Sequence, residues 1–411
     1  MTLRRVCLAL IASLALTAVT IVVTVQPASA LEEWDVTLVE ANDSPCTLYS
    51  TTSIALDSLG APNICYRICG ESSSIWYSVK HAALQSDTWD VSFVDGGGNA
   101  FTILPTSIAI DTEDIIHIGH SNVTWGESLI RYANNSAGDW TMTDISDGEG
   151  IGTMCVDSQG VAHICYAVRI GLLDALAYAS NADGTWTSEI IDDLNHTMHA
   201  SIALDSDDQV HIAYTIYDGD YSVLYATNAD GAWNPSVVDF GRYGAIAVDP
   251  NDNPRVVYVG KDIDQAAIKC AERSGMCWEN STVDFAESID WFPSITIDTE
   301  YRTHVSYSTH TTSSSTLMYA VETDDEWVKS VVEHFEADYF PFLVHSSIVV
   351  DASGDVHICY MRGQSSSHDD GGGLKYATTQ TLVIPEMSSL ALPLVAMTTI
   401  AVFLILCRIR R

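Results

Sequence analysis

Short runs of apolar and β-forming residues follow one another along most of the chain, and turn residues separate them. The pattern is clearest where the sequence reads SIALD at 201–205, VHIAY at 210–214, LYATN at 224–228 and DGAW at 230–233. Runs of this length, bounded by Asp, Asn and Gly, predict four successive β-strands. The fourth strand of this unit begins at Trp233 and ends near Asp239.

Two residues of this four-stranded unit recur along the chain. An Asp closes the first strand in seven copies spaced 44 to 54 residues apart, and a Trp opens the fourth strand in six copies. A unit of four strands with this period is typical of a β-propeller blade, whereas a β-sandwich would lack the period and a helical solenoid would need apolar spacing of 3.6. The Asp copies are Asp57, Asp111, Asp157, Asp205, Asp249, Asp298 and Asp351, and the Trp copies are Trp89, Trp140, Trp186, Trp233, Trp278 and Trp327.

The seventh Trp stands at the other end of the chain. Residues 34–39 (WDVTLV) read as a fourth strand that begins with Trp34 and precedes the first unit, while the last unit stops after its third strand at 374–378 (LKYAT). A ring closed by the N-terminal strand accounts for both observations, because closure removes the exposed sheet edges. We therefore expect an all-β fold over residues 31–380: a seven-bladed β-propeller with four antiparallel strands per blade.

Both chain ends are apolar, and each is expected to form a helix outside the propeller. Residues 1–30 read as a secretory signal peptide, in which Arg4 and Arg5 precede an apolar run and Ala28-Ser29-Ala30 forms a cleavage site; an uncleaved anchor is the alternative. Residues 390–407 are just long enough to span a bilayer, and the basic tail at 408–411 places that end in the cytoplasm. These features predict a propeller on the extracellular face of the membrane, anchored at its C-terminus.

A short motif precedes the C-terminal apolar segment. Residues 381–389 hold a linker and the order Ile384-Pro385-Glu386-Met387. Pro-Glu-x, an apolar helix and a basic tail in this order resemble the PEF-CTERM sorting signal of archaeal surface proteins, although Met387 replaces the usual Phe. The resemblance implies removal of the tail by an archaeosortase; a plain C-terminal anchor is the alternative.

The charge balance restricts the possible partners. The whole chain has 18 basic and 54 acidic residues, and residues 31–380 remain strongly acidic with only five Lys. Binding to nucleic acid or to anionic lipid is not expected, because both require a cationic face. Such a surface stays hydrated at high salt, which favours a saline host and a monomer.

The repeated Asp residues invite a catalytic reading, since in five units a His follows six residues later. One ring is expected to have one active site, so a pair that recurs in most blades is better interpreted as framework. The Asp side chain can accept hydrogen bonds from the hairpin backbone, and the His can steady the next strand. The repeated Tyr and Trp residues are expected to fill the space between blades.

Eight cysteines lie between the two terminal segments, and an even number in an exported chain suggests disulfides. The repeat positions suggest the pairs Cys155–Cys165, Cys270–Cys277, Cys65–Cys359 and Cys46–Cys69, although eight cysteines allow 105 pairings. None shows a C-x2-C spacing, so no metal site is expected at these thiols.

Candidate contact residues lie in the segments that vary between units. Such loops open on one face of a propeller, where aromatic side chains can contact a sugar or a protein; packing of the loops on one another is the alternative. Arginines after the second strand could hold a carboxylate of a ligand, or could form salt bridges within the chain. The ligand-binding candidates are Arg67, Arg169, Arg362, Trp291, Phe292, Tyr339, Phe340 and His345.

Cofactor signals are weak. No catalytic residue and no metal site is assigned: His196 and His199 have no helix to support a metal-binding spacing, and the Asp-rich turn at 205–208 lacks a full EF-hand pattern for Ca2+. N-x-S/T sequons, which predict a glycoprotein in an exported chain, begin among other places at Asn122, Asn134, Asn195 and Asn280.

Over residues 34–379 the units resemble those of sialidase-type and BNR-like propellers in their blade plan. The sialidase Asp box, S-x-D-x-G-x-x-W, is replaced here by N-A-D-G-x-W at 181–186 and 228–233, and no Tyr–Glu nucleophile pair can be assigned. The resemblance therefore implies a fold and no activity. We expect a non-catalytic surface protein that binds a glycan or another protein; the alternatives are a glycoside hydrolase (sialidase-like) or polysaccharide lyase, and a structural protein of the cell envelope.

Overall fold

The computed structural model describes residues 34–41, 51–69, 77–96, 105–123, 128–148, 150–262, 265–289, 292–323, 326–336, 345–362 and 372–379. The expected signal peptide, sorting motif and C-terminal apolar helix lie outside these ranges. Within them, no helix is long and apolar enough to cross a bilayer.

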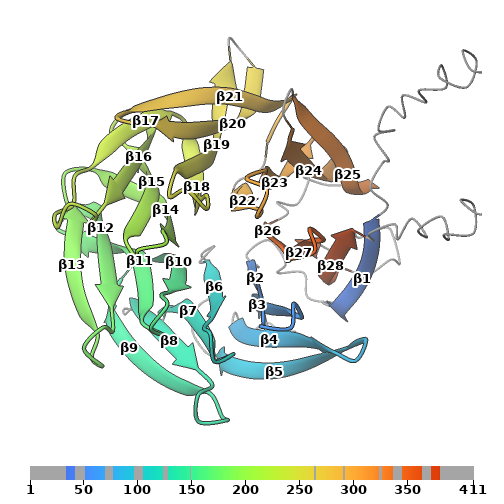
Figure 1. Ribbon diagram of the computed structural model, residues 1–411, viewed down its shortest axis with the longest axis horizontal. Coiled ribbons are helices and arrows are strands. Elements are labelled where there is room, and N and C mark those ends of the chain that lie inside the picture. Colours follow the sequence, from blue (N-terminus) through green and yellow to red (C-terminus); the bar gives the residue numbers. More distant parts are fainter. Residues whose placement is uncertain are drawn as a thin grey trace, which may run out of the picture. The chain divides into compact units, whose positions relative to one another are not determined.

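The strands form seven four-stranded antiparallel sheets arranged as a ring of blades (Figure 1). The predicted seven-bladed propeller is thereby confirmed. Blade 1 contains β2 (Thr52–Leu56), β3 (Pro62–Cys69), β4 (Tyr77–Gln85) and β5 (Thr88–Gly96); blade 2 contains β6 (Thr106–Ile110), β7 (Ile116–Val123), β8 (Ser128–Asn134) and β9 (Thr141–Asp147). Blade 3 contains β10 (Gly150–Val156), β11 (Ala162–Ile170), β12 (Leu173–Ser180) and β13 (Thr187–Asp192); blade 4 contains β14 (His196–Leu204), β15 (Val210–Tyr217), β16 (Tyr221–Thr227) and β17 (Ser236–Phe240). Blade 5 contains β18 (Arg242–Val248), β19 (Pro254–Asp262), β20 (Gln265–Ser274) and β21 (Cys277–Ala286); blade 6 contains β22 (Ser294–Ile297), β23 (Thr303–His310), β24 (Ser314–Glu322) and β25 (Trp327–Glu336). Blade 7 contains β26 (Ser346–Val350), β27 (Val356–Arg362), β28 (Gly373–Thr379) and β1 (Trp34–Ala41).

The first and last described strands close the ring. Strand β1 pairs antiparallel with β28, from Trp34 opposite Thr379 to Ala41 opposite Gly373. In Figure 1 the blue β1 lies beside the red β28 as the outer strand of blade 7. The count of six Trp against seven Asp in the sequence predicted this closure.

The core is divided among the joints between blades. Seven clusters of buried side chains each join two neighbouring blades; one of them unites Tyr319 of blade 6 with Tyr360 of blade 7. The repeat Trp residues contribute by packing on a ring of the preceding blade at centroid distances of 5.1 to 5.5 Å. These pairs are Trp34–Tyr319, Trp89–Tyr376, Trp140–His81, Trp186–Tyr132, Trp233–Tyr178 and Trp278–Tyr225.

A series of hydroxyl groups links the innermost strands around the central axis. In six joints a backbone N–H of one blade donates to a Ser or Thr hydroxyl of the preceding blade, at 2.8 to 3.3 Å. The pairs are Ile54–Ser347, Ile108–Ser53, Met154–Ser107, Ile202–Thr153, Ile246–Ser201 and Ile348–Ser294. At the joint between blades 5 and 6 the corresponding position is Ala245, which has no hydroxyl.

The disulfide prediction is wrong for the cysteines whose side chains the structure describes, because these are free thiols: Cys65, Cys155, Cys165, Cys270, Cys277 and Cys359. Strand register explains two of the failures. Cys155 lies opposite His163 rather than Cys165, and Cys277 lies opposite Ser274, four residues from Cys270.

The third expected pair, Cys65–Cys359, is not formed either. The Cys359 thiol instead lies 2.9 Å from the Thr52 hydroxyl. Burial raises the pKa of the Cys65, Cys165, Cys270 and Cys359 thiols to about 12, which leaves them unreactive. Cys46 and the side chain of Cys69 lie outside the described part of the chain.

Candidate functional site

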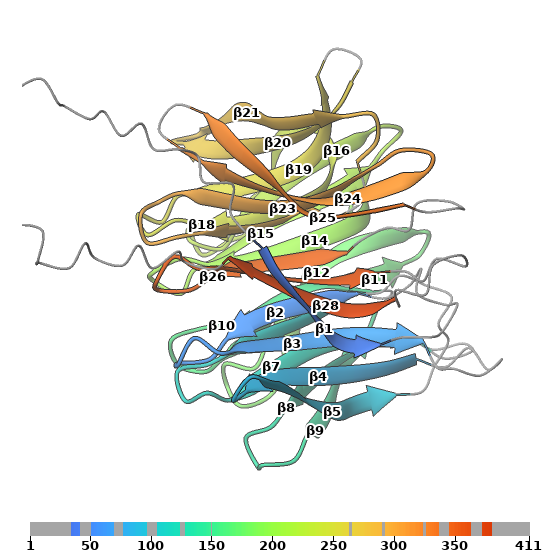
Figure 2. The ribbon, with the colours of Figure 1, turned by 90° about the vertical axis from the view of Figure 1, so that its right-hand side faces the viewer.

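The ring has two faces, which the direction of the innermost strands distinguishes. The innermost strand of each blade begins at one face, here called the loop face, and ends at the opposite face with the repeated Asp, here called the turn face. Figure 2 shows the ring from the side, with the strands running from one face to the other.

At the turn face the repeated Asp holds its hairpin closed. In all seven blades one carboxylate oxygen accepts hydrogen bonds from the backbone N–H groups two and four residues later; for Asp157 these come from Gln159 and Val161, at 2.9 and 2.8 Å. The residue three positions after each Asp has a positive φ, which Gly and Asp tolerate better than most residues. These residues are Gly60, Asp114, Gly160, Asp208, Asp252, Tyr301 and Gly354.

The five Asp–His pairs extend into longer relays. Each His Nδ1 accepts a hydrogen bond from the hydroxyl of a Tyr on the third strand, at 2.5 to 2.7 Å, and its Nε2 lies 3.0 to 3.6 Å from the Asp. Burial lowers the pKa of His117, His163, His304 and His357, so these rings are neutral at pH 7. The Tyr is also the residue on which the next blade's Trp packs, so the relays form part of the blade joints. The five relays are Asp111–His117–Tyr132, Asp157–His163–Tyr178, Asp205–His211–Tyr225, Asp298–His304–Tyr319 and Asp351–His357–Tyr376.

A second set of contacts between blades was not predicted. A Tyr on the second strand donates its hydroxyl proton to a carboxylate on the outer strand of the preceding blade, at 2.5 to 2.9 Å. Four of the five carboxylates also bind a Lys, for example Lys80 on Glu40 at 2.7 Å. The available signal was an acidic residue near the end of most fourth strands. The pairs are Tyr66–Glu40, Tyr214–Asp192, Tyr258–Asp239, Tyr307–Asp284 and Tyr360–Glu333.

The three candidate arginines do not form a common site. Arg67 is buried with its guanidinium 3.6 Å from the centre of the Tyr77 ring. Arg169 forms an ion pair with Asp174 within its own blade. Arg362 is also buried and lies 3.5 Å from Glu333. They belong to blades 1, 3 and 7, so the alternative of contacts within the chain describes them.

The loop-face candidates Phe292 and His345 do come together. Their ring centroids are 5.3 Å apart, and Phe292 also lies 4.8 Å from His199 and 4.9 Å from Tyr243. The four residues stand at or near the start of the innermost strands of blades 6, 7, 4 and 5, so they gather at the mouth of the ring. Trp291, Tyr339 and Phe340 lie outside the described residues.

This cluster continues outward over blade 4. The guanidinium of Arg242 lies 5.4 Å from the centre of the Tyr243 ring and 5.9 Å from that of Tyr221, and Tyr221 lies 4.9 Å from Tyr217. These planar groups form one series from the second and third strands of blade 4 to the innermost strands around the axis. We call it the aromatic track; it consists of Tyr217, Tyr221, Arg242, Tyr243, His199, Phe292 and His345.

The backbone of the track is strained at two places. Tyr243 has a φ of 58° and Phe292 a φ of 64°, values that are unusual for bulky residues. Such conformations persist only where the surrounding structure imposes them, and they concentrate at functional sites. No sequence signal distinguished Tyr243 or Arg242, because they occupy ordinary strand positions.

The two track histidines are neutral near pH 7. Desolvation lowers the pKa of His199 and of His345 to about 4, and the proximity of the two rings lowers the pKa of His199 further. Among the described residues, neither Nδ1 atom has a hydrogen-bond partner. A buried nitrogen without a partner is costly, so these two atoms are suited to hydrogen bonds from a ligand.

Within the described ranges, no three metal-ligating side chains gather as a cation site would require. In the Asp-rich turn at 205–208, which was considered for Ca2+, Asp205 and Asp208 accept hydrogen bonds from the protein itself. Asp205 caps its own hairpin, and Asp208 accepts hydrogen bonds from Ser158 of the neighbouring blade at 2.6 and 3.1 Å.

Comparison with known proteins supports the fold alone. No protein-family model and no curated protein matches the chain. Among solved structures, a PL25 ulvan lyase bound to a GlcA–Rha3S repeat is 10% identical with a TM-score of 0.54, covering 84% of this chain and 94% of its own. The protein YCF48 bound to a D1 peptide is 10% identical with a TM-score of 0.52, covering 85% of this chain and 96% of its own. Hydrazine synthase of Kuenenia stuttgartiensis is 9% identical with a TM-score of 0.50, covering 78% and 94%.

Proposed function

We propose that this propeller is a cell-surface protein that binds an anionic polysaccharide along the aromatic track without cleaving it. The observation that carries the proposal is Arg242. It lies between two Tyr rings, and no carboxylate of the described residues forms an ion pair with it, although the chain has 54 acidic residues.

The chemistry of the track suits a sugar acid. The guanidinium of Arg242 offers a planar pair of N–H donors that matches a carboxylate or a sulfate. The Tyr and Phe rings offer flat apolar surfaces, and the neutral His rings offer hydrogen-bonding nitrogens, which is the mixture of an apolar wall and a few polar groups found in binding sites. A chain of sugar rings also fits a row of contacts better than a single small ligand does.

The overall charge opposes an anionic partner at long range. The net charge of −36 repels a polyanion at low ionic strength, but the screening length falls to about 3 Å at 1 M salt. Contact between Arg242 and a carboxylate survives this screening better than long-range repulsion does. Binding is therefore expected to strengthen when salt is raised from very low concentrations.

The test is binding of the purified full-length protein to an array of uronic acid, sulfated and neutral polysaccharides. Wild type should prefer the anionic glycans, and Arg242→Gln should bind them at least about tenfold more weakly, the loss of one charge-assisted contact. Arg302→Gln is the matched control, because Arg302 lies at the turn face and pairs with Asp298. Equal binding of neutral and anionic glycans, or an unchanged affinity of the Arg242 variant, would overturn the proposal.

A second candidate function, polysaccharide lyase, is favoured by the proximity of His199, Tyr243 and Arg242. In β-elimination a base removes the proton next to the uronate carboxylate, the bond to the leaving oxygen breaks, and that oxygen takes up a proton. Arg242 could neutralise the carboxylate, while His199 and Tyr243 supply base and acid. Incubation with polyuronates, followed by ultraviolet absorbance of the unsaturated product, decides this; product formation lost in His199→Gln would replace the binding proposal.

Surface display rests on the two terminal segments and needs its own test. The signal-like N-terminus and the apolar, basic-tailed C-terminus support it. External protease applied to intact cells should release propeller fragments. Protection equal to that of a cytoplasmic marker would contradict display at the surface.

A further inference from the structure

Blade 1 departs from the relay that five other blades share. Asn63 occupies the position of the relay His, and His81 occupies the position of the relay Tyr. The two side chains contact each other, with His81 Nε2 lying 3.0 Å from the Asn63 amide oxygen. Both replacements are smaller than the residues used elsewhere, so the joint between blades 1 and 2 is less filled at the turn face.

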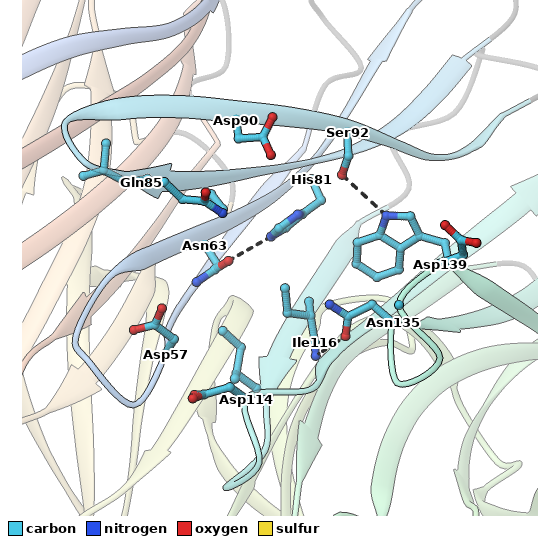
Figure 3. Close-up of a pocket in the computed structure, with 15 residues that line it drawn as sticks. Asp57, Asn63, His81, Gln85, Asp90, Ser92, Asp114, Ile116, Asn135 and Asp139 are labelled. Atoms are coloured by element: carbon cyan, nitrogen blue, oxygen red, sulfur yellow. Dashed lines mark hydrogen bonds between the residues drawn. The ribbon is translucent and has the colours of Figure 1, made fainter.

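A pocket of about 550 Å³ lies at this joint (Figure 3). Its volume is within the range of small-molecule sites. Trp140 of blade 2 forms one wall and packs edge-on against His81 at 5.5 Å between ring centroids. Figure 3 shows Asp90 and Ser92 above His81 and Asp57 below it. The pocket lies on the face opposite the aromatic track.

The lining carries negative charge and no positive charge. Four carboxylates line it, from Asp57, Asp90, Asp114 and Asp139, and no Lys or Arg is among the described residues that line it. Asp114 is used by Ser58, which donates two hydrogen bonds to it at 2.7 and 2.8 Å. An anionic ligand is excluded by this charge, and a cation is favoured.

The loss of the relay His releases one oxygen of Asp57. In the other relays the second carboxylate oxygen faces an imidazole, whereas the Asn63 amide instead donates to the backbone oxygen of Ala61 at 3.2 Å. Among the residues described, no hydrogen-bond donor reaches that oxygen of Asp57, while its other oxygen caps the turn.

His81 adds an acceptor to the same space. Because its Nε2 faces an amide oxygen, Nε2 carries the proton and Nδ1 has a lone pair. Only 7% of the His81 surface is exposed, and the described residues provide no hydrogen-bond partner for Nδ1. The inner wall therefore combines a carboxylate oxygen, an imidazole lone pair and an aromatic face, all of which attract a positively charged N–H donor.

We infer that this pocket binds an organic primary ammonium group. Such a group supplies N–H donors for Asp57 and His81, positive charge for the carboxylates, and a cation for the Trp140 ring. A bare metal ion fits less well, because within the described part of the chain no three metal-ligating groups come together.

The test uses isothermal titration calorimetry on the full-length protein with n-butylammonium, with 1-butanol as the uncharged probe of similar size and with glucose as a neutral sugar. Butylammonium should bind at least about tenfold more tightly than butanol or glucose. Tighter binding of glucose, or equal binding of the two butyl probes, would show that charge does not select the ligand and would overturn the inference.

Two variants localise the site. The double change Asn63→His with His81→Tyr restores the side chains of the other relays, so it should keep the fold and abolish butylammonium binding. Asp90→Asn removes an exposed lining charge and should weaken binding severalfold, while Asp183→Asn, an exposed carboxylate of blade 3, should not. Unfolding curves confirm that each variant is folded; retained affinity in the double variant would place the ligand elsewhere. Track binding of anionic glycans should be unchanged in all three.

Discussion

The indole nitrogen of Trp34 donates a hydrogen bond to the hydroxyl of Ser330 at 3.1 Å, across 296 positions of sequence. This contact joins the closing strand of blade 7 to the outer strand of blade 6, and the Trp34 ring also packs on Tyr319 at 5.3 Å. The closing strand is therefore held by side chains of the neighbouring blade as well as by its own backbone ladder.

Replacement of Trp34 by Ala should destabilise the ring. The indole is partly buried in the cluster between blades 6 and 7, so its loss should lower the free energy of unfolding by about 2–4 kcal/mol. Urea unfolding measures the change. Leu38→Ala on the same strand is the control, because Leu38 is 51% exposed and its loss should have little effect. Similar losses in the two variants would mean that the indole contributes no more than an exposed side chain.

Removal of a relay hydroxyl should lower the free energy of unfolding, although the aromatic ring that fills the joint is kept. Tyr319→Phe leaves the buried Nδ1 of His304 without its 2.7 Å partner, and an orphaned buried acceptor costs about 1–3 kcal/mol. Tyr301→Phe, at an exposed turn, should change the free energy of unfolding by less than about 0.5 kcal/mol. A smaller loss in the Tyr319 variant than in this control would contradict a structural role for the relay.

The missing hydroxyl between blades 5 and 6 can be restored. Ala245→Ser should offer an acceptor to blade 6 as Ser201 does to Ile246, and should raise the free energy of unfolding by about 0.5–1.5 kcal/mol. Ser201→Ala should lower it by a similar amount. Thermal unfolding of both variants tests the pair; destabilisation by the added hydroxyl would show that this joint has no room for it.

Acid should destabilise the fold as pH falls below 6.5. Burial lowers the pKa of His81, His120, His199 and His345 from 6.5 to about 4, so between these values the unfolded chain binds protons that the folded chain does not. The stabilisation is complete above pH 6.5 and is lost as pH falls toward 4. The melting temperature should fall over this range, and less steeply in the double variant His199→Gln with His345→Gln. An identical slope would assign the acid sensitivity to other groups.

In a Cys46→Ser, Cys69→Ser variant, reducing agent should not change the melting temperature, because the thiols described are free. Alkylation of the native protein should label Cys277, which is exposed, and spare Cys65, Cys165 and Cys359, which are buried. Peptide mass spectrometry distinguishes labelled from protected thiols. A peptide pair joined through Cys155 and Cys165 would contradict the structure.

The sequence was sufficient for the blades and for their closure. The repeated Asp and Trp predict the blades, because each marks a local turn or strand start. The additional fourth strand at Trp34 predicts the closure, because the strands can be counted from the sequence. The loop-face cluster could be predicted only in part. Phe292 and His345 were candidates because they lie in variable segments, whereas Tyr243 and Arg242 occupy regular strand positions. The contacts among these side chains depend on how neighbouring blades are rotated around the ring, and no local sequence pattern shows that rotation.

For the described cysteines, the disulfide prediction failed for a related reason. Alternation along strands shows which residues share a face, but Cys155 and Cys165 share a face without being opposite each other. The Asn63 and His81 replacements were present in the sequence as departures from the repeat. The two replacements leave room for a pocket. The pocket could not be predicted from them alone, because it also depends on the position of Trp140 in the next blade.

The pairing of Trp34 with Thr379 has a consequence for orientation. Both residues stand at the ends of their strands that belong to the turn face, so the polypeptide enters and leaves the ring side by side, away from Tyr243 and Phe292. Chain segments attached before Trp34 and after Thr379 therefore join the ring on the side of the Asp57 pocket, which leaves the aromatic track on the opposite face.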